Sequence, residues 1–180
     1  MLRITIPAVE LWDEQKQEFS MAKAVHLQLE HSLVSISKWE SKWCKPFLLS
    51  GDKPIAETLD YVRCMTLTQN VPDDVYNRLT NANIQQIVSY IDAPMTAIRF
   101  SGKKEGKHPN EQITAETIYY RMITLGIPFE CQKWHLNRLL ALIDVCVTKS
   151  EPPKKMSKRE LMKRNAALNA ARRKKLNSKG

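Results

Sequence analysis

Glycine is scarce in this sequence, with only 5 glycines among 180 residues. A many-stranded β-sandwich needs turn residues at short, regular intervals, so this shortage argues against that class. The 9 prolines are spread between periodic segments, which favours helices joined by short connections. The hydrophobic fraction of 43% is enough for an ordinary buried core, and the length fits one domain with an appendage.

Long apolar runs are also missing. No stretch approaches the roughly 18 consecutive apolar residues of a membrane-spanning helix. The N-terminal segment MLRITIPAVELWDEQ has no basic region followed by an apolar run, which is the pattern of a signal peptide. We therefore expect a cytoplasmic protein that does not interact with membranes.

The cysteines form no C-x-x-C pair. Because each lies in an apolar periodic stretch, they are expected to be free, buried thiols in a reducing compartment: Cys44, Cys64, Cys131 and Cys146. Cys131 and His135 would share one helix face and are the best metal candidate. A pair of ligands does not make a structural zinc site, so we expect neither a metal nor a cofactor.

The motifs of catalysis are missing as well. There is no G-x-S-x-G sequence, and Gly102 and Gly106 lie among charged residues without a phosphate-binding pattern. The adjacent carboxylates of Asp73 and Asp74 are better explained as the start of a helix, where they interact favourably with its dipole. We expect that the protein is not an enzyme.

The net charge of +9 is confined to the end of the chain. Residues 149–180 hold 12 of the 28 Lys and Arg residues but only 2 of the 19 Asp and Glu residues, which leaves 16 basic and 17 acidic residues before them. This asymmetry indicates a tail with an acidic partner or an electrostatic role of its own. Its candidate binding residues are Lys154, Lys155, Lys158, Arg159, Lys163, Arg164, Arg172, Arg173, Lys174 and Lys175.

The spacing of apolar residues predicts the order of elements. Weak alternation over residues 2–11 predicts an edge strand, and a second strand near 18–24 would complete a hairpin. Helical spacing begins at His26 and continues to Trp43. Further helices are predicted over 55–65, 75–79, 84–91, 114–125 and 136–147, with Gly126 as a C-terminal cap. Residues 95–100 and 111–113 are predicted to pair as short strands.

These elements predict a mainly α protein. Residues 1–150 form a compact helical domain with one or two small β-hairpins, and residues 151–180 form a basic C-terminal helical arm. The segment Glu151-Pro152-Pro153 marks the linker, and Ser157 to Glu160 matches a capping box. Because the arm has few large apolar residues, we expect it to be mobile alone and to become ordered on a partner.

Tryptophans are the candidate partner-binding residues of the helical domain. Trp39 and Trp43 in SKWESKW share one helix face. Their rings either complete the core or line a groove for a partner, because tryptophan is enriched at binding hot spots. The same two interpretations apply to Trp134, at the start of the last helix of this domain.

The basic arm has three interpretations. A nucleic-acid-binding arm would neutralise phosphates, with an affinity that falls steeply with salt. Residues 149–180 contain no aromatic residue, so base stacking and sequence-specific recognition are not expected. Alternatively, the arm packs on an acidic or helical protein surface, or it serves only as a solubilising tail.

Several strings carry a resemblance to a known family. They are QLEHSLVSISKWESKW, KPFL, YVRCMTLT, IDAPMTA, ITAETIYYRMITLGIPFECQKWHLNRLLALIDVC and PPKKMSKRELMKRNAALNAARRKKLNSKG. In this order they resemble the tail assembly chaperones of long-tailed (siphovirus-type) bacteriophages and related prophages. The resemblance extends over nearly the whole chain from about Leu27.

The resemblance implies a function without catalytic residues. Such chaperones bind the long, helical tape measure protein, keep it soluble and help tail tube subunits polymerise around it. They act in the host cytoplasm and are usually absent from the mature virion, and a frameshifted longer form is common. The expected partners are the tape measure protein and the tail tube protein, and self-association remains open. The alternatives are a nucleic-acid-binding accessory protein that uses the basic arm, or a structural tail or neck component.

Overall fold

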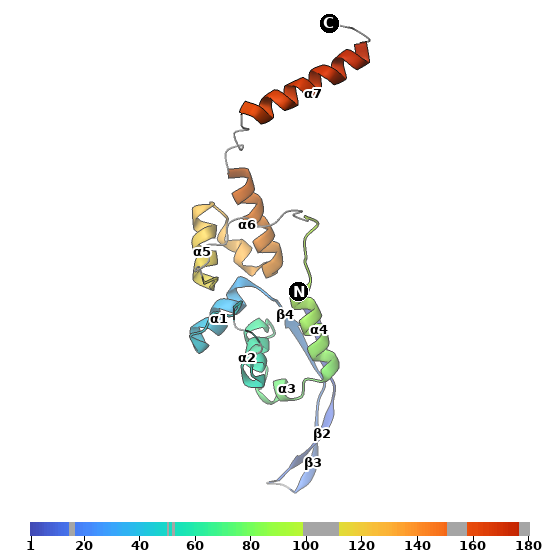
Figure 1. The fold of residues 1–180 in the computed structure, drawn as a ribbon. Helices are drawn as coiled ribbons and strands as arrows, with labels where there is room; N and C mark the ends of the chain where they lie inside the picture. The colour runs from blue at the N-terminus through green and yellow to red at the C-terminus, as the bar shows by residue number, and fades with distance from the viewer. Residues whose placement is uncertain (15–16, 50, 52, 99–111, 151–157, 177–180) are drawn as a thin grey trace. The chain divides into compact units, whose positions relative to one another are not determined.

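The structure is a computed structural model that describes residues 1–14, 17–49, 51, 53–98, 112–150 and 158–176. The chain divides into two units, Met1–Cys146 and Val147–Gly180. The described residues are mostly helical, with two pairs of antiparallel strands (Figure 1). The prediction of a mainly α protein is therefore confirmed.

The first unit begins with a β-ribbon. Strand β1 (Leu2–Ile6) pairs with β4 (Val25–Leu29), and β2 (Val9–Asp13) pairs with β3 (Glu18–Ala22). Ile6 lies opposite Val25 and Val9 opposite Ala22, so the register continues unchanged across the break between the two pairs. Pro7 lies at this break and has no N–H to donate to the ladder.

The predicted hairpin is present, but the predicted helix starts too early. Residues 26–29 belong to β4, where Leu27 and Leu29 are buried and His26 and Gln28 are exposed. This alternation is the pattern of a strand with one buried face. The helix predicted from His26 therefore begins only at Leu33.

Seven helical segments follow the ribbon among the described residues up to Ser150. They are α1 (Leu33–Trp43), α2 (Ile55–Met65), α3 (Asp74–Asn77), α4 (Asn81–Asp92), α5 (Ala115–Thr124), the 3₁₀ helix η1 (Phe129–Lys133) and α6 (Leu136–Ser150). Ser32, Thr80 and Thr114 each begin a helix with a capping box, which satisfies backbone N–H groups at the helix start. These caps explain why the helices begin where they do.

The core lies where the ribbon and the helices meet. Its fully buried large side chains include Leu27, Leu29, Leu33, Ile36, Trp39, Met65, Met122, Leu136 and Leu139. Backbone hydrogen bonds hold the elements together: Glu30 N donates to Met65 O at 2.9 Å, and Leu136 N donates to His31 O at 2.7 Å. The starts of α1 and α6 are thereby fixed to each other, next to the end of α2.

Two sequence predictions for helices can be compared directly with this core. The prediction of Gly126 as a left-handed cap is confirmed, since its φ is 64° and Ile127 N donates to Met122 O at 2.8 Å. The helix predicted over 84–91 is present as α4, but the apolar spacing that predicts it does not describe one buried face. Ile87 and Tyr90 are buried, whereas Ile84 and Val88 are exposed.

The predicted strand over 95–100 is also wrong where it can be compared. Met95–Ile98 contains no strand, and Met95 has a φ of 47°. The rest of this strand lies outside the described residues, as does Glu111 of its predicted partner. The other two residues of the partner, Gln112 and Ile113, are not in a strand. The exposed turn expected at Ser101–Lys107 also lies outside them.

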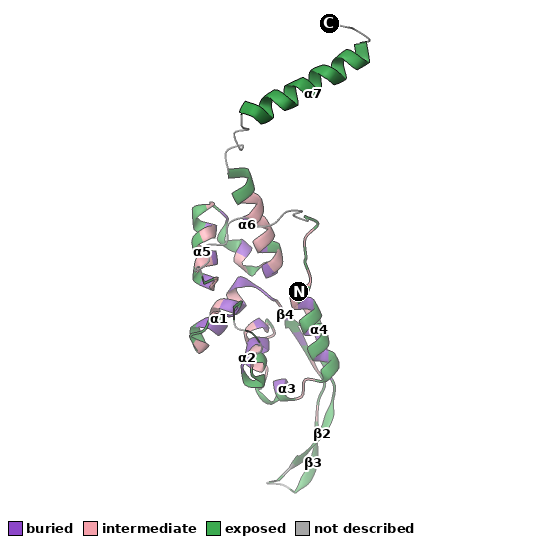
Figure 2. Ribbon diagram, viewed as in Figure 1, coloured by how far each residue is buried: buried purple, intermediate pink, exposed green. Residues whose placement is uncertain are grey.

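The described part of the second unit contains the end of α6 and the helix α7 (Lys158–Leu176). Every residue of α7 is exposed, as the green ribbon in Figure 2 shows. The linker at 151–153 and the predicted cap at Ser157 lie outside the described residues. Helix α7 begins one residue after that serine.

Candidate protein-binding surfaces

The two tryptophans of α1 stack on each other but differ in exposure. Their ring centroids are 6.2 Å apart, and Trp39 also packs edge-on against Phe47. Trp39 is 0% exposed, and its indole N–H donates to Glu57 O at 2.9 Å. The prediction that Trp39 contacts a partner is therefore corrected: this ring belongs to the core, which was the other interpretation of the pair.

Trp43 is half-buried and lies among charged groups. Its indole N–H donates to Asp60 Oδ2 at 2.9 Å, and the Lys42 ammonium contacts Asp60 Oδ1 at 2.5 Å. Lys42 and Lys45 also lie within 6 Å of the Trp43 ring centroid, at 5.9 and 5.8 Å. These contacts fix the ring between α1 and α2, so only its outer edge is available to a partner.

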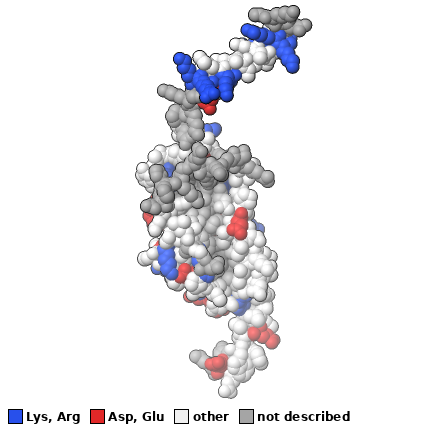
Figure 3. Space-filling view, viewed as in Figure 1, with Lys and Arg blue, Asp and Glu red and all other residues white. Residues whose placement is uncertain are grey.

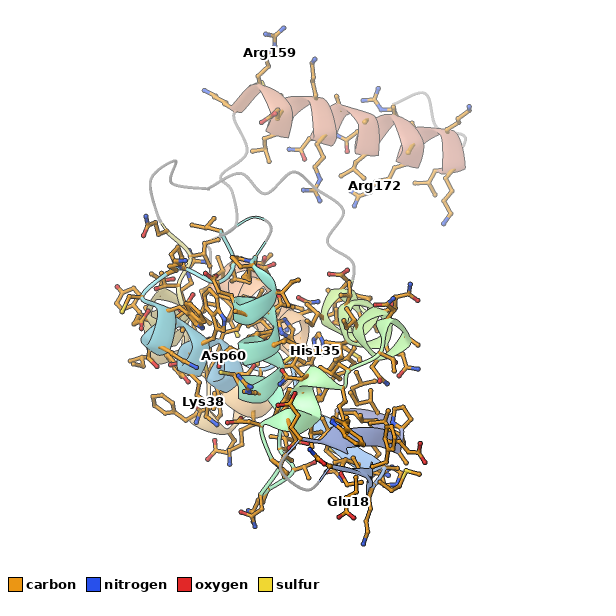
Figure 4. All side chains as sticks on the ribbon, turned by 90° about the horizontal axis from the view of Figure 1, so that it is seen from below. Glu18, Lys38, Asp60, His135, Arg159 and Arg172 are labelled. Carbon is orange, nitrogen blue, oxygen red and sulfur yellow. The ribbon has the colours of Figure 1, made fainter. Side chains whose placement is uncertain are left out.

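The charge of Asp60 is stabilised by the same contacts. Burial would raise the pKa of this carboxyl, but the hydrogen bonds from Lys42 and Trp43 and the attraction of Lys42 and Arg63 outweigh it, so the pKa lies below its usual value. Figure 4 labels Asp60 on α2 and Lys38 on α1. The cluster therefore joins α1 and α2 through ionised groups, and the Asp60 carboxylate carries no proton at neutral pH.

Trp134 lies apart from α1 in the sequence, immediately before α6, and is half-buried. The Arg138 guanidinium carbon is 4.2 Å from its ring centroid, which is a cation–π contact on the first turn of α6. The structure thus leaves Trp134 partly accessible, and its role in partner binding remains a prediction.

The basic residues divide between described and undescribed parts. Lys154 and Lys155 lie outside the described residues. The others lie on α7, and all of them are exposed: Lys158, Arg159, Lys163, Arg164, Arg172, Arg173, Lys174 and Lys175. Figure 3 shows these side chains in blue along the helix, and Figure 4 labels Arg159 and Arg172.

Two buried histidines form a polar chain inside the first unit. His31 Nδ1 lies 2.5 Å from Tyr61 Oη, and the His31 and His135 rings meet edge-to-face with centroids 5.1 Å apart. His135 Nε2 lies 2.9 Å from Tyr90 O, a carbonyl that can only accept, so Nε2 is the donor. Asn137 N donates to His135 Nδ1 at 3.3 Å, which leaves this ring neutral.

The two buried histidines are held in their neutral form. Burial, and then the nearby His135, lower the pKa of His31 to about 4, and burial also lowers the pKa of His135. Both rings are buried, and they connect α1, α2, α4 and the start of α6.

The predicted metal pair is not on one helix face. Cys131 lies in η1 and is buried, whereas His135 precedes α6. Among the described residues, no group of three or more His, Cys, Asp or Glu side chains is arranged to hold a metal ion. All four cysteines are free thiols, and Cys44, expected to be buried, is exposed at the C-terminal end of α1.

One exposed apolar surface was missed by the sequence analysis. Strands β2 and β3, which we call the outer hairpin, extend beyond the helices of the first unit (Figure 1). Trp12, Phe19 and Met21 are 51%, 68% and 62% exposed. Strand alternation was the signal for this surface. It places Glu10 and Trp12 on the same face of their strand, and Phe19 and Met21 on the same face of theirs.

Comparison with known proteins gave no relatives: no protein-family model matches the chain, and neither the curated proteins nor the solved structures include a significant match. Within the part of the chain that the structure describes, no helix combines the length and apolar character needed to cross a membrane. Beyond the sequence resemblance, a proposal for the function of this chain depends on its own surfaces.

Proposed function

We propose that this chain is a tail assembly chaperone of a long-tailed bacteriophage or prophage, and that it binds and solubilises the tape measure protein. The proposal begins from the sequence resemblance described above. It places the activity in the host cytoplasm during infection and leaves the protein out of the mature virion. The tail tube protein is a second partner under this proposal.

The observation that supports the proposal most is the outer hairpin. The first unit has a well-packed core, yet this hairpin presents several large apolar side chains to solvent. Exposed apolar patches on an otherwise well-packed protein mark binding sites for other proteins. A chaperone that holds an amphipathic helical rod needs such a surface, because the rod aggregates when its own apolar stripe is left in water.

Helix α7 fits the same proposal as a basic arm. It is solvated on all sides and has a narrow set of apolar residues, so its order on a partner would come from the contacts made there. The same helix supports a second candidate, a nucleic-acid-binding accessory protein. Exposed Lys and Arg side chains on one helix suit phosphate contacts, although the helix has no aromatic residue for stacking.

Co-expression tests the proposed function directly. The full chain carrying an affinity tag is expressed with the long coiled-coil product of a neighbouring gene, and the tagged protein is purified. The proposal predicts that the coiled-coil protein becomes soluble and co-purifies with the tagged chain. A coiled-coil product that stays insoluble with the chain present, or that elutes separately from it, would contradict the proposal.

A further inference from the structure

The outer hairpin has an aromatic face. Trp12 lies opposite Phe19, and Glu10 lies opposite Met21. Residues directly opposite each other in an antiparallel pair share one face of the ribbon. The rings of Trp12 and Phe19 meet edge-to-face with centroids 5.0 Å apart, so the face is preformed and its two largest side chains support each other.

This aromatic face continues the buried side of the ribbon. Because the register is unchanged across the break, the side that carries Trp12 and Phe19 also carries Ile4, Ile6 and Leu27. In β1 and β4 these side chains are buried in the core with residues of the helices. In β2 and β3 the same side of the ribbon is exposed (Figure 2).

The exposed half of the ribbon lacks the layer that would stabilise it. A two-stranded hairpin alone is only marginally stable in water, whereas a helix packed on one face gives it a core. The first unit supplies such a layer only to β1 and β4. The outer hairpin is therefore suited to receive a helix from another protein at the place where its own helical layer ends.

The charge of the hairpin indicates which helix would fit. Residues 9–22 contain four acidic residues and one lysine: Glu10, Asp13, Glu14, Glu18 and Lys16. Glu10 lies on the aromatic face itself and Glu14 is exposed near the turn, whereas Glu18 lies opposite Asp13 and therefore on the other face of the hairpin. Figure 3 shows acidic side chains in red at this end of the unit, and Figure 4 labels Glu18. An acidic rim favours a cationic partner and disfavours an acidic one.

We propose that the aromatic face of the outer hairpin binds an amphipathic α-helix whose apolar stripe is flanked by Lys and Arg residues. Trp12, Phe19 and Met21 contact the apolar stripe, and Glu10 faces a basic flank. This inference rests on the proposed function, in that both require a protein partner. The outer hairpin of a second copy is disfavoured as the occupant, because two outer hairpins would bring like charges together.

The test uses the full chain and a labelled peptide of defined chemistry. The peptide is helical, with Leu at the heptad a and d positions and Lys beside them, and a matched peptide has Glu in place of Lys. Fluorescence anisotropy at physiological salt measures binding. We expect the Lys peptide to bind at least about 10-fold more tightly than the Glu peptide, since the rim charge selects between them.

Hairpin variants connect this binding to the aromatic face. Trp12→Ser with Phe19→Ser should weaken binding of the Lys peptide by at least about 10-fold, because aromatic anchors dominate such contacts. The matched control is Tyr120→Ser with Ile123→Ser, which removes two exposed apolar side chains from α5 and should leave binding unchanged. Glu10→Lys should reduce the preference for the Lys peptide over the Glu peptide. Equal binding by the wild type and the Trp12 and Phe19 variant would overturn the proposal.

Other occupants give different results. If sedimentation velocity shows a wild-type dimer that Trp12→Ser with Phe19→Ser converts to a monomer, the occupant is a second copy and the proposal fails. It also fails if a Lys-rich peptide that forms β-structure binds more tightly than the helical peptide. That result would place the binding site at the edges of the hairpin strands instead of on the aromatic face. Circular dichroism of each variant confirms that the helices are retained.

A tape measure fragment separates this inference from the proposed function. If the fragment binds the wild type and the Trp12 and Phe19 variant equally, the inference is wrong and the chaperone function stands. If the Lys peptide binds the aromatic face and the fragment does not bind at all, the inference stands and the tape measure protein is not the partner.

Discussion

Glu40 is a buried carboxylate that joins three segments of the first unit. Its Oε1 accepts from Phe47 N at 2.7 Å, and its Oε2 accepts from Ala115 N, at the start of α5, at 2.7 Å. A buried N–H that loses its acceptor costs about 1–3 kcal/mol. We therefore predict that Glu40→Ala lowers the free energy of unfolding by about 2–5 kcal/mol, measured by urea denaturation.

The control for Glu40 is Lys38→Ala, on the exposed side of the same helix. Its effect should stay within about 0.5 kcal/mol, which is the range of ordinary surface substitutions. If the two variants had the same stability, the two hydrogen bonds of Glu40 would not contribute to the fold.

Leu139 tests the packing of α6. Its side chain is fully buried, whereas Leu140 beside it is only half-buried. Leu139→Ala should lower the free energy of unfolding by about 2–5 kcal/mol, because it removes a transfer contribution and leaves a cavity. Leu140→Ala should cost less in the same chemical denaturation. A cost below about 0.5 kcal/mol for Leu139→Ala would place this residue at the surface.

The buried histidines predict how stability depends on pH. The folded state holds the pKa of His31 at about 4, below the value of 6.5 that applies when the chain is unfolded. The unfolded state therefore binds more protons between these values, and stability is lost as the pH falls through this range. The contribution of His31 is on the order of 1–3 kcal/mol.

Comparison with a variant isolates this contribution from that of the carboxylates. His31→Gln keeps an acceptor near Tyr61 but cannot be protonated in this range. Free energies of unfolding measured from pH 7 to pH 4 should decrease less steeply for the variant than for the wild type. Parallel pH profiles would show that His31 takes up its proton equally in both states.

At this scale the sequence predicted burial better than it predicted exposure. The spacing of α6 predicts one apolar stripe, of which Leu136, Leu139 and Ile143 are buried, Leu140 and Cys146 are half-buried and Val147 is exposed. Trp39 and Trp43 share a face as well, yet only Trp39 is buried. Their difference depends on Phe47 and α2, which come from other parts of the chain, and no periodicity within α1 contains that information.

At the scale of elements, local signals mark where several helices begin and end. Thr114 was recognised as a helix start and Gly126 as a helix end, because a cap acts within a few residues. The end of the β-ribbon was harder to predict. Residues 25–29 alternate as a strand and also fit helical spacing, and their pairing with β1 decides between the two. That pairing partner lies 19 to 27 positions away in the sequence.

Helix α7 is expected not to contribute to the stability of the first unit. None of its residues is buried, and it lies in a separate unit from the core. A protein that ends at Ser150 should therefore keep a cooperative thermal transition, with a midpoint within about 2 °C of the full chain. Circular dichroism should show the loss of helical signal from α7 alone. If the thermal transition disappears, the last 30 residues are part of the core, contrary to this account.

At the scale of the whole molecule, charge and apolar surface are separated along the chain. The first unit contains the exposed aromatic face, and most of the net positive charge lies on and beside α7. The charge asymmetry was visible in the sequence because it requires only counting. The exposed aromatic face was not, since it depends on where the helical layer of the first unit ends.

These two surfaces respond differently to salt, and this difference distinguishes the candidate functions. Phosphate contacts release counterions, so binding of a nucleic acid through α7 should weaken by orders of magnitude between low and physiological salt. Apolar burial on the first unit is not weakened by salt in this way. A tape measure fragment should therefore bind with modest salt dependence, and its binding should need both units.

The most direct test of the chaperone function is one salt titration of the full chain with two ligands, a tape measure fragment and a DNA duplex. We predict that the fragment remains bound at physiological salt and that the duplex binds weakly and without sequence preference. The fragment should also bind less tightly to the protein that ends at Ser150. The account is contradicted if the duplex binds more tightly than the fragment at physiological salt and the fragment does not bind, which would assign the chain to nucleic-acid binding.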